Sequence, residues 1–359
     1  MLTGRVFGSP ASSTRPWRAA LIAFALAALA SPLSAQTTPS VSVGAGLQTA
    51  FTHTSQDGQD DVSSFGVRDM RLYVNGTAAE HINFMFNTAY TPSDNKVDVL
   101  DAVAQISTSA KFNVWFGRFL PPSDRANLYG PFYAHHWGVY SDGVQDGYPF
   151  VYQGRQNGAM YWGQFGKVKV SGGGFDGASA TGNADLIAAG RVQVDFWDAE
   201  DGYYLNGTYY GDKNLLAIGA AGQVQGSGRT AYNLDFLLER KVPVGGAYTV
   251  EAQWARYEKL GGYNPQYRVN DGGYILGSYL FPQMAGQGRF EILGKYARAR
   301  FREGLLPIDA NYDQKTTELN LNYVIKQFNA RLMMFYKDTR FDAVRSDFKQ
   351  IGVGMQIQM

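Results

Sequence analysis

The 359-residue chain contains no cysteine and only four histidines. The absence of cysteine excludes disulfides and thiol chemistry. Its 32 basic side chains nearly balance 31 acidic ones, so the formal net charge is only +1. Such a balance argues against a nucleic-acid partner, which would favour a basic patch. The longest apolar run, 19–30 near the N-terminus, has 12 residues and is well short of the roughly 20 that a transmembrane helix needs.

Aromatic residues and glycine are abundant, although the mean hydropathy is slightly negative. The chain has 23 Tyr, 22 Phe and 42 Gly. A membrane β-barrel reconciles these facts, because only alternate residues face lipid while aromatic residues gather at the interfaces. A soluble β-sandwich or an extracellular adhesin shares part of this composition. The pattern along the chain must therefore decide between these folds.

The N-terminal segment has the features of a secretory signal peptide. Arg15 and Arg18 precede an apolar run over 19–30, and small residues at Ser34 and Ala35 offer a cleavage site. A buried core helix is a poor alternative, because nothing around the run is amphipathic or capped. We predict that residues 1–35 are a signal peptide and that 36–359 form the transmembrane domain.

Residues 351–359 alternate without a miss to the last residue of the sequence. Ile, Val and Met occupy the odd positions, whereas Gly and Gln occupy the even ones. This period of two predicts a strand with one apolar face. We expect such a last strand in a transmembrane barrel, where it pairs with the first strand and leaves no edge.

The same alternation recurs along most of the chain after residue 40. It predicts strands whose apolar faces are Val41, Val43, Ala45, Leu47 and Phe51; Met70, Leu72 and Val74; Ile82, Phe84 and Phe86; Val192, Val194 and Phe196; Tyr232, Leu234, Phe236 and Leu238; Tyr248, Val250, Ala252 and Trp254; Phe290, Ile292 and Tyr296; and Leu319, Leu321 and Tyr323. The strands are long and numerous, and their polar faces are repeatedly charged. These features favour a barrel over a sandwich.

The connections are predicted to alternate between tight and long. Tight turns are expected near 78–79, 109–110, 166, 243–246, 283–287 and 326–327, and longer loops at 53–63, 120–157, 176–186, 259–270, 302–314 and 340–346. Short periplasmic turns and longer external loops produce this asymmetry. A direct count gives about 17 strands, but such barrels have an even number. We predict 16 antiparallel strands, with 18 as the alternative, because 203–210 and 215–225 could be divided differently.

The longest stretch without strand character, 120–157, is expected to form the pore constriction. Its length indicates a functional segment, and its aromatic residues and prolines argue against disorder. Folded into a wide barrel, it would narrow the lumen and place charge beside the solute. The alternative is an external lid over the strand ends.

Charged side chains on the polar strand faces predict a hydrated interior. Any one of these charged side chains could instead form an ion pair with a neighbour inside the barrel. The predicted pore-lining and constriction residues are Arg71, Asp124, Arg125, Asp142, Asp146, Arg155, Lys167, Lys169, Arg191, Lys295 and Arg331.

Two further patterns carry little chemistry. His135 and His136 would point in opposite directions on an extended segment, and no third ligand is placed by sequence, so we expect neither a metal nor a cofactor. Tyrosines near strand ends fit interfacial girdles; these are Tyr90, Tyr210, Tyr274, Tyr279 and Tyr336. Tyrosines could also be carbohydrate-stacking platforms, which would require several on one inward face.

Four segments resemble a known family. They are 68–76 (RDMRLYVNG), 84–86 (FMF), 101–103 (DAV) and 116–122 (FGRFLPP). This run is similar to the early strands, the next hairpin and the loop entry of the phosphate-selective porin O and P family. The resemblance implies a 16-stranded trimeric porin with a loop folded into the channel. Phosphate selectivity in that family depends on a dense basic lining, whereas 120–157 carries several aspartates and no lysine.

Together these patterns predict an outer-membrane porin, exported through the inner membrane. It would be a homotrimeric passive channel for small hydrophilic solutes or ions, surrounded by outer-membrane lipid and without a catalytic step. One alternative is a barrel enzyme such as a lipase or protease, which needs a nucleophile and a base within hydrogen-bond reach. Another is a structural or adhesive barrel with a closed lumen.

Overall fold

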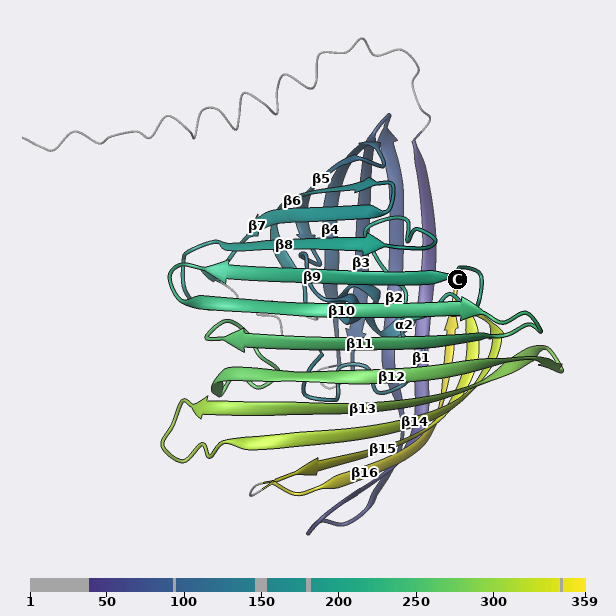
Figure 1. Ribbon diagram of the computed structural model, residues 1–359. Coiled ribbons are helices and arrows are strands. Elements are labelled where there is room, and N and C mark those ends of the chain that lie inside the picture. The colour runs from purple at the N-terminus through teal and green to yellow at the C-terminus, as the bar shows by residue number, and fades with distance from the viewer. Residues whose placement is uncertain (1–38, 93–94, 146–153, 179–181, 343–344) are drawn as a thin grey trace, which may run out of the picture. The chain divides into compact units, whose positions relative to one another are not determined.

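The computed structural model describes residues 39–92, 95–145, 154–178, 182–342 and 345–359. They form sixteen strands and one short helix, α2 (Figure 1). The elements are β1 (Ser40–Gln56), β2 (Val62–Ala79), β3 (Ile82–Thr91), β4 (Lys96–Ser109), β5 (Phe112–Phe119), α2 (Arg125–Tyr133), β6 (Gln156–Phe165), β7 (Val168–Phe175), β8 (Ile187–Asp195), β9 (Leu215–Gln225), β10 (Arg229–Lys241), β11 (Ala247–Glu258), β12 (Tyr267–Ala285), β13 (Gly288–Gly304), β14 (Tyr312–Lys326), β15 (Ala330–Phe341) and β16 (Phe348–Gln358). The predicted signal peptide, 1–35, lies outside the described residues.

The strands close into a single antiparallel barrel. Each strand pairs with its neighbours in sequence, and β1 pairs with β16. In that closing pair Leu47 lies opposite Ile357 and Phe51 lies opposite Val353. Closure leaves no edge strand whose backbone groups lack partners. The prediction of 16 strands is confirmed, and the alternative of 18 is wrong.

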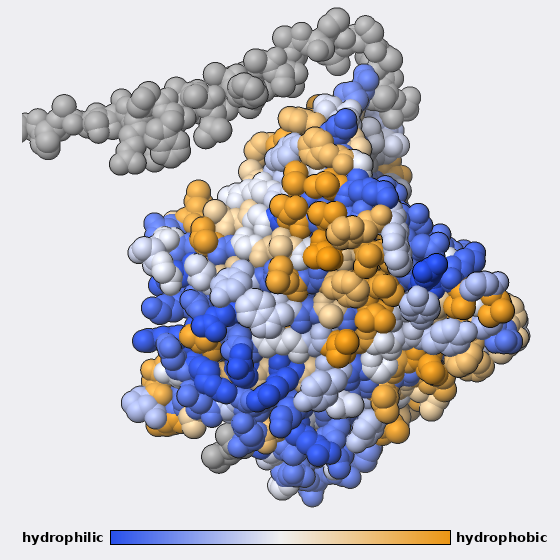
Figure 2. All heavy atoms as spheres, in the orientation of Figure 1, coloured by the Kyte–Doolittle hydropathy of each residue, from blue (hydrophilic) through white to orange (hydrophobic). Residues whose placement is uncertain are grey.

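The wall is apolar outside and polar inside. On β16, Val353 is 47% exposed and Ile357 is equally exposed, whereas Gln356 is fully buried. The predicted apolar faces of the other strands also point outward. In Figure 2, hydrophobic residues gather over part of the outer wall and hydrophilic residues toward the lower left. An exposed apolar wall around a polar interior suits a barrel surrounded by lipid.

Among the residues that the structure describes, no helix is both long and apolar enough to cross a membrane.

The two ends of the barrel carry different connections. The end where β1 begins and β16 finishes, the terminal end, carries mostly tight turns, at 80–81, 110–111, 166–167, 242–246, 286–287 and 327–329. The opposite end, the loop end, carries the connections 57–61, 92–95, 120–155, 176–186, 226–228, 259–266, 305–311 and 342–347. The predicted alternation of tight and long connections therefore holds for most of the chain.

One connection reverses this pattern. Segment 196–214 joins β8 to β9 at the terminal end, and it is long, whereas the next loop-end connection, 226–228, is tight. The sequence analysis left open a strand at 203–210, and the structure has no strand there. Gly202 and Gly211 have positive φ angles of 84° and 85°, and Tyr210 has a φ of 53°, which extended strands do not allow. These residues instead turn the chain into the barrel, where Tyr203 and Leu205 are buried.

Candidate functional site

The described part of segment 120–155 lies inside the barrel. Asp124 starts α2 by accepting a hydrogen bond from the backbone N–H of Asn127 at 2.7 Å. The helix is kinked at Gly130, whose φ is 62°, and at Pro131. Nearly every residue from 120 to 139 is buried. The segment thus lies where the constriction interpretation placed it and not over the barrel end as a lid would.

Amide side chains of the wall hold the carbonyl groups of this segment. Gln48 of β1 donates to Pro131 O at 3.0 Å, and Gln356 of β16 donates to Phe132 O at 2.9 Å. Likewise, Asn322 of β14 donates to a carbonyl oxygen of the segment at 2.7 Å. Irregular backbone in a barrel lacks the hydrogen bonds of a sheet, so buried groups need such partners. Lumen-facing Gln and Asn therefore fix the segment to several strands.

Aromatic rings of the segment pack against wall glycines. A Cβ at Gly46 would lie 2.7 Å from the Phe132 ring, and one at Gly354 would lie 2.5 Å from the Trp137 ring. Trp137 also stacks on Phe335, with ring centroids 5.2 Å apart and planes at 10°. One glycine of β1 and one of β16 therefore provide the space in which this segment docks.

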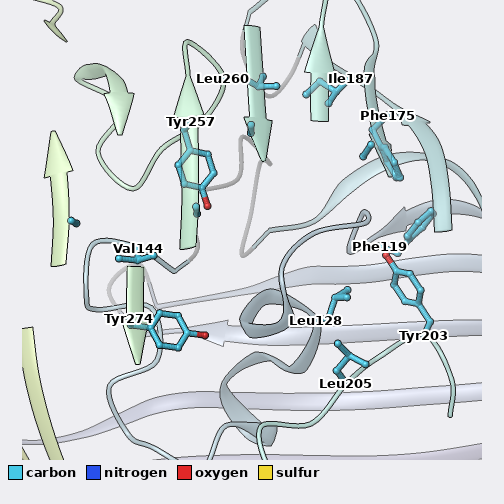
Figure 3. Close-up of a cluster of buried hydrophobic side chains, with 14 of the residues drawn as sticks. Phe119, Leu128, Val144, Phe175, Ile187, Tyr203, Leu205, Tyr257, Leu260 and Tyr274 are labelled. Atoms are coloured by element: carbon cyan, nitrogen blue, oxygen red, sulfur yellow. The ribbon is translucent and has the colours of Figure 1, made fainter. Parts of the chain in front are cut away.

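Segment 196–214 enters from the terminal end and meets segment 120–155 in the lumen. Leu205 N–H donates to Leu128 O at 3.3 Å, and Tyr203 OH donates to Leu120 O at 2.8 Å. Figure 3 shows Leu205 and Tyr203 near Leu128 within a buried apolar cluster. The wall residue Glu239 accepts three hydrogen bonds from 208–211 and anchors the second segment. The two segments together narrow the barrel from opposite ends.

A buried ion pair joins the two segments. The guanidinium of Arg125 donates twice to the carboxylate of Glu200, with Nη1 to Oε1 at 2.9 Å and Nη2 to Oε2. Both side chains are fully buried. Burial alone would raise the pKa of Glu200, but Arg125 holds that pKa below its ordinary value. Arg191 and Asp235 of the wall form a second pair beside Arg125, at 2.5 and 2.8 Å.

Asp124 is another buried carboxylate of this region. It accepts hydrogen bonds from Asn127 N–H and, at 3.0 Å, from Gln253. Burial raises the pKa of Asp124 to about 7, while these hydrogen bonds oppose the shift. The carboxyl therefore titrates near neutrality at the helix start.

The two adjacent histidines lie in separate polar clusters. Lys295 contacts Asp142 at 2.7 Å and His136 Nε2 at 3.2 Å. Burial, with the Lys295 ammonium second, lowers the pKa of His136 well below its ordinary range. Within the described ranges, no group of three or more His, Cys, Asp or Glu side chains is placed to hold a metal.

His135 lies near a serine and a carboxylate. Its Nδ1 is 3.4 Å from Ser278 Oγ and 3.3 Å from Glu291 Oε1. In nucleophilic catalysis the serine and the carboxylate bond different ring nitrogens, so that the base can accept the serine proton. Here both contacts fall on one nitrogen, while Nε2 is buried without a protein partner. This geometry does not match an acyl-transfer site.

A cavity of about 600 Å³ remains beside the inserted segments, on the side of β2–β4. Arg71 donates to Asp69 at 3.0 and 3.2 Å, and Arg155 contacts Asp101 at 3.2 Å. Asn87 donates to the same Asp101 at 2.9 Å. Both arginines line the cavity. Asn87 and Asp101 line it as well, and the other lining residues are Ser42, Val43, Gly44, Tyr73, Asn75, Met85, Leu120, Leu128, Tyr129, Gly130, Tyr133, Tyr204, Leu205, Asn206 and Met359.

The structure separates the predicted site residues into groups. Arg71 and Arg155 line the cavity. Seven others are buried where the inserted segments meet the wall: Asp124, Arg125, Asp142, Lys169, Arg191, Lys295 and Arg331. The pore-lining prediction for Lys167 needs correction, because it lies exposed in the 166–167 turn and donates to Phe196 O at 2.9 Å. Asp146 lies outside the described residues.

The sequence analysis missed the contribution of 196–214. Glu200, Tyr203 and Thr208 are buried partners of the constriction segment or of the wall. Two signals were available in the sequence. The odd strand count required one apparent strand to be removed, and 196–214 carries a glycine every four or five residues.

No family model matches the chain. No curated protein matches it either.

Solved structures share the fold at low sequence identity. OmpF of Salmonella typhi, in complex with daunomycin, has a TM-score of 0.61 and 9% identity, covering 90% of this chain and 100% of that one. OprB of Pseudomonas putida, in a high-pH structure, has a TM-score of 0.58 and 9% identity, covering 89% and 94%. A loop-deletion mutant of OmpT, an outer membrane protein of Vibrio cholerae, has a TM-score of 0.57 and 14% identity, covering 90% and 100%. The chain therefore has the fold of an outer-membrane porin.

Proposed function

We propose that this protein is a passive diffusion channel of the bacterial outer membrane for small hydrophilic solutes or ions. The observation that carries the proposal is the cavity at β2–β4, which remains beside the two inserted segments and is lined by apolar, aromatic and charged side chains. Selection then follows from the width of the lumen and from the charges on its wall. No chemical step is involved.

The outer-membrane location and the trimeric state belong to the same proposal. An apolar outer wall suits contact with outer-membrane lipid. One structure of the Vibrio cholerae OmpT is described as a trimer form, and it has a TM-score of 0.55 and 13% identity to this chain. Chemical cross-linking of the purified protein should therefore yield dimers and trimers in detergent.

The charge pattern does not favour a phosphate channel. Arg71, Arg125, Arg155, Arg191 and Lys295 each contact a carboxylate. A paired guanidinium offers less net charge to an anion than the dense basic lining of phosphate-selective porins. We therefore propose weak ion selectivity, and we propose no phosphate specificity despite the sequence resemblance.

A barrel enzyme is the weaker candidate. His135, Ser278 and Glu291 lie together, but both partners contact one ring nitrogen, and His135 and Glu291 are buried. Purified protein should therefore show no esterase or peptidase activity that is lost on replacing Ser278 by Ala.

Single-channel recording in a planar bilayer with a salt gradient tests the proposal. Stable open steps with a small reversal potential are expected. Correctly folded barrels without conductance would overturn it and favour the structural barrel with a closed lumen.

A further inference from the structure

Four tyrosines meet at the cavity beside β2–β4. Tyr73 comes from the wall, Tyr129 and Tyr133 come from α2, and Tyr204 comes from segment 196–214. Stacking of a sugar ring requires several aromatic side chains around one inward space. The structure meets this requirement with tyrosines other than those near the strand ends that the sequence pattern singled out.

Three polar atoms at the cavity have no hydrogen-bond partner on the protein. They are the hydroxyls of Tyr73 and Tyr204 and the Oδ1 of Asn87. Asn87 is only 7% exposed, and its other amide atom donates to Asp101. A buried polar atom without a partner is unfavourable, so such atoms favour a ligand that can hydrogen-bond to them. The two tyrosine hydroxyls can donate to and accept from the hydroxyl groups of a ligand, and the carbonyl oxygen of Asn87 can accept from them.

The charges at the cavity are already paired with one another. Arg71 contacts Asp69, and Arg155 contacts Asp101. An ionic ligand would have to compete with these pairs, whereas a neutral ligand would not. Arginine and aspartate can still donate to and accept from the hydroxyls of such a ligand while they remain paired.

The size of the cavity also fits a small molecule. Its volume of about 600 Å³ lies within the roughly 300–1,000 Å³ of small-molecule sites. The lining combines apolar rings with a few polar groups, which is the usual composition of such sites. We propose that this cavity is a binding subsite for an uncharged, ring-shaped polyol of monosaccharide size. The physiological meaning of the subsite rests on the proposed channel function.

In this arrangement the apolar face of the ring stacks on tyrosine side chains. The buried hydroxyls of Tyr73 and Tyr204 and the Oδ1 of Asn87 bond to the ring hydroxyls when these side chains turn toward the cavity. Binding is expected to be weak, so that the solute can leave as well as enter.

Glucose is the probe, and two methods measure its binding. Saturation-transfer NMR on detergent-solubilised protein detects weak binding without any requirement for conduction. Titration of single channels detects the same site as saturable block and excess current noise. A polyethylene glycol of matched size controls for exclusion by volume alone, and gluconate controls for charge.

The test variants are Tyr73→Phe, Tyr204→Phe and the double variant. Each keeps the ring and removes one hydroxyl, so each should weaken glucose binding roughly three- to tenfold. Tyr296→Phe is the matched control, because Tyr296 faces outward and is 47% exposed. A heat-dependent shift in gel mobility confirms that each variant is folded.

The outcomes separate this inference from the channel function. Saturable glucose binding that Tyr73→Phe and Tyr204→Phe weaken supports the subsite, even if the barrel does not conduct. Open channels with a glucose response equal to that of polyethylene glycol would overturn the subsite and leave the channel function intact. Equal binding in all variants, or tighter binding of gluconate than of glucose, would also overturn it.

Discussion

Two sides of the same lumen carry similar residue types but use them differently. On the packed side, formed by the inner faces of β8–β14, charged side chains contact the inserted segments or the residues that hold them. On the open side, formed by β2–β4, Asp69 pairs with Arg71 of the same strand and Asn87 bonds to Asp101 of the next strand. Arg155, at the end of segment 120–155, also contacts Asp101 on this side. The packed side is filled by the segments that its side chains hold, whereas the open side keeps a cavity of about 600 Å³ beside its charged pairs. We therefore expect a solute to pass along β2–β4.

Removing the ion pair between the two segments should have the largest effect. Arg125→Met leaves Glu200 buried without its guanidinium partner, and breaking a buried pair costs about 3–5 kcal/mol. We expect a lower unfolding temperature by circular dichroism and a larger, noisier conductance. Arg256→Met is the matched control, because the Arg256–Glu258 pair is partly exposed and such pairs contribute at most about 1 kcal/mol.

The double variant Arg125→Met/Glu200→Met sharpens this test. Replacing both partners of a buried pair by apolar groups is often close to neutral. The double variant should therefore recover most of the lost stability. Equal unfolding temperatures for Arg125→Met and Arg256→Met would show that the pair does not fix the segments.

Filling the glycine beneath Trp137 should have a smaller effect. A Cβ at Gly354 would lie 2.5 Å from the Trp137 ring. Gly354→Ala should therefore push the segment away from β16, at a cost of about 1–3 kcal/mol. Gly277→Ala is the control, because a Cβ at Gly277 meets nothing within 4 Å. Conductance and thermal unfolding should change for Gly354→Ala and stay near wild type for Gly277→Ala, and the reverse order would contradict the docking.

The last of these effects concerns Asp124 and is a dependence of stability on pH. The pKa of Asp124 is about 7 in the folded protein, above the roughly 3.9 expected in the unfolded chain. The folded state then binds more protons between these values, so its stability falls as the pH rises from about 4 to about 7. Asp124→Asn removes this pH-dependent loss of stability and keeps an Oδ1 that can accept the hydrogen bond from Asn127 N–H. The variant should be more stable than wild type at pH 8 and approach it by pH 4.5; an unfolding-temperature difference that is constant with pH would contradict the titration.

The wall of the barrel could be predicted from sequence, because alternation is a local pattern. The outward faces at Val353, Phe236 and Leu321 follow from a period of two alone. Because such barrels have an even number of strands, the direct count of about 17 could be reduced to 16. The constriction segment could be located by its length and by its lack of alternation.

The interior could not be predicted, because its contacts join residues far apart in sequence. Nothing near Arg125 indicates that its partner is Glu200, from a connection at the opposite end of the barrel. The same is true of Gly354 beneath Trp137. The pore-lining prediction for Lys167 was wrong for a local reason. The strand β7 begins one residue later, at Val168, so Lys167 lies in the turn.

The most direct test of the central claim uses the absence of native cysteine. Asn87→Cys places one thiol on the open side, and Asn233→Cys places one on the packed side, where Asn233 is 2% exposed. A charged methanethiosulfonate reagent is then added during single-channel recording. We predict that the current of Asn87→Cys falls in discrete steps while that of Asn233→Cys does not change. Block of Asn233→Cys alone, or no block at either position in conducting channels, would contradict a solute path along β2–β4.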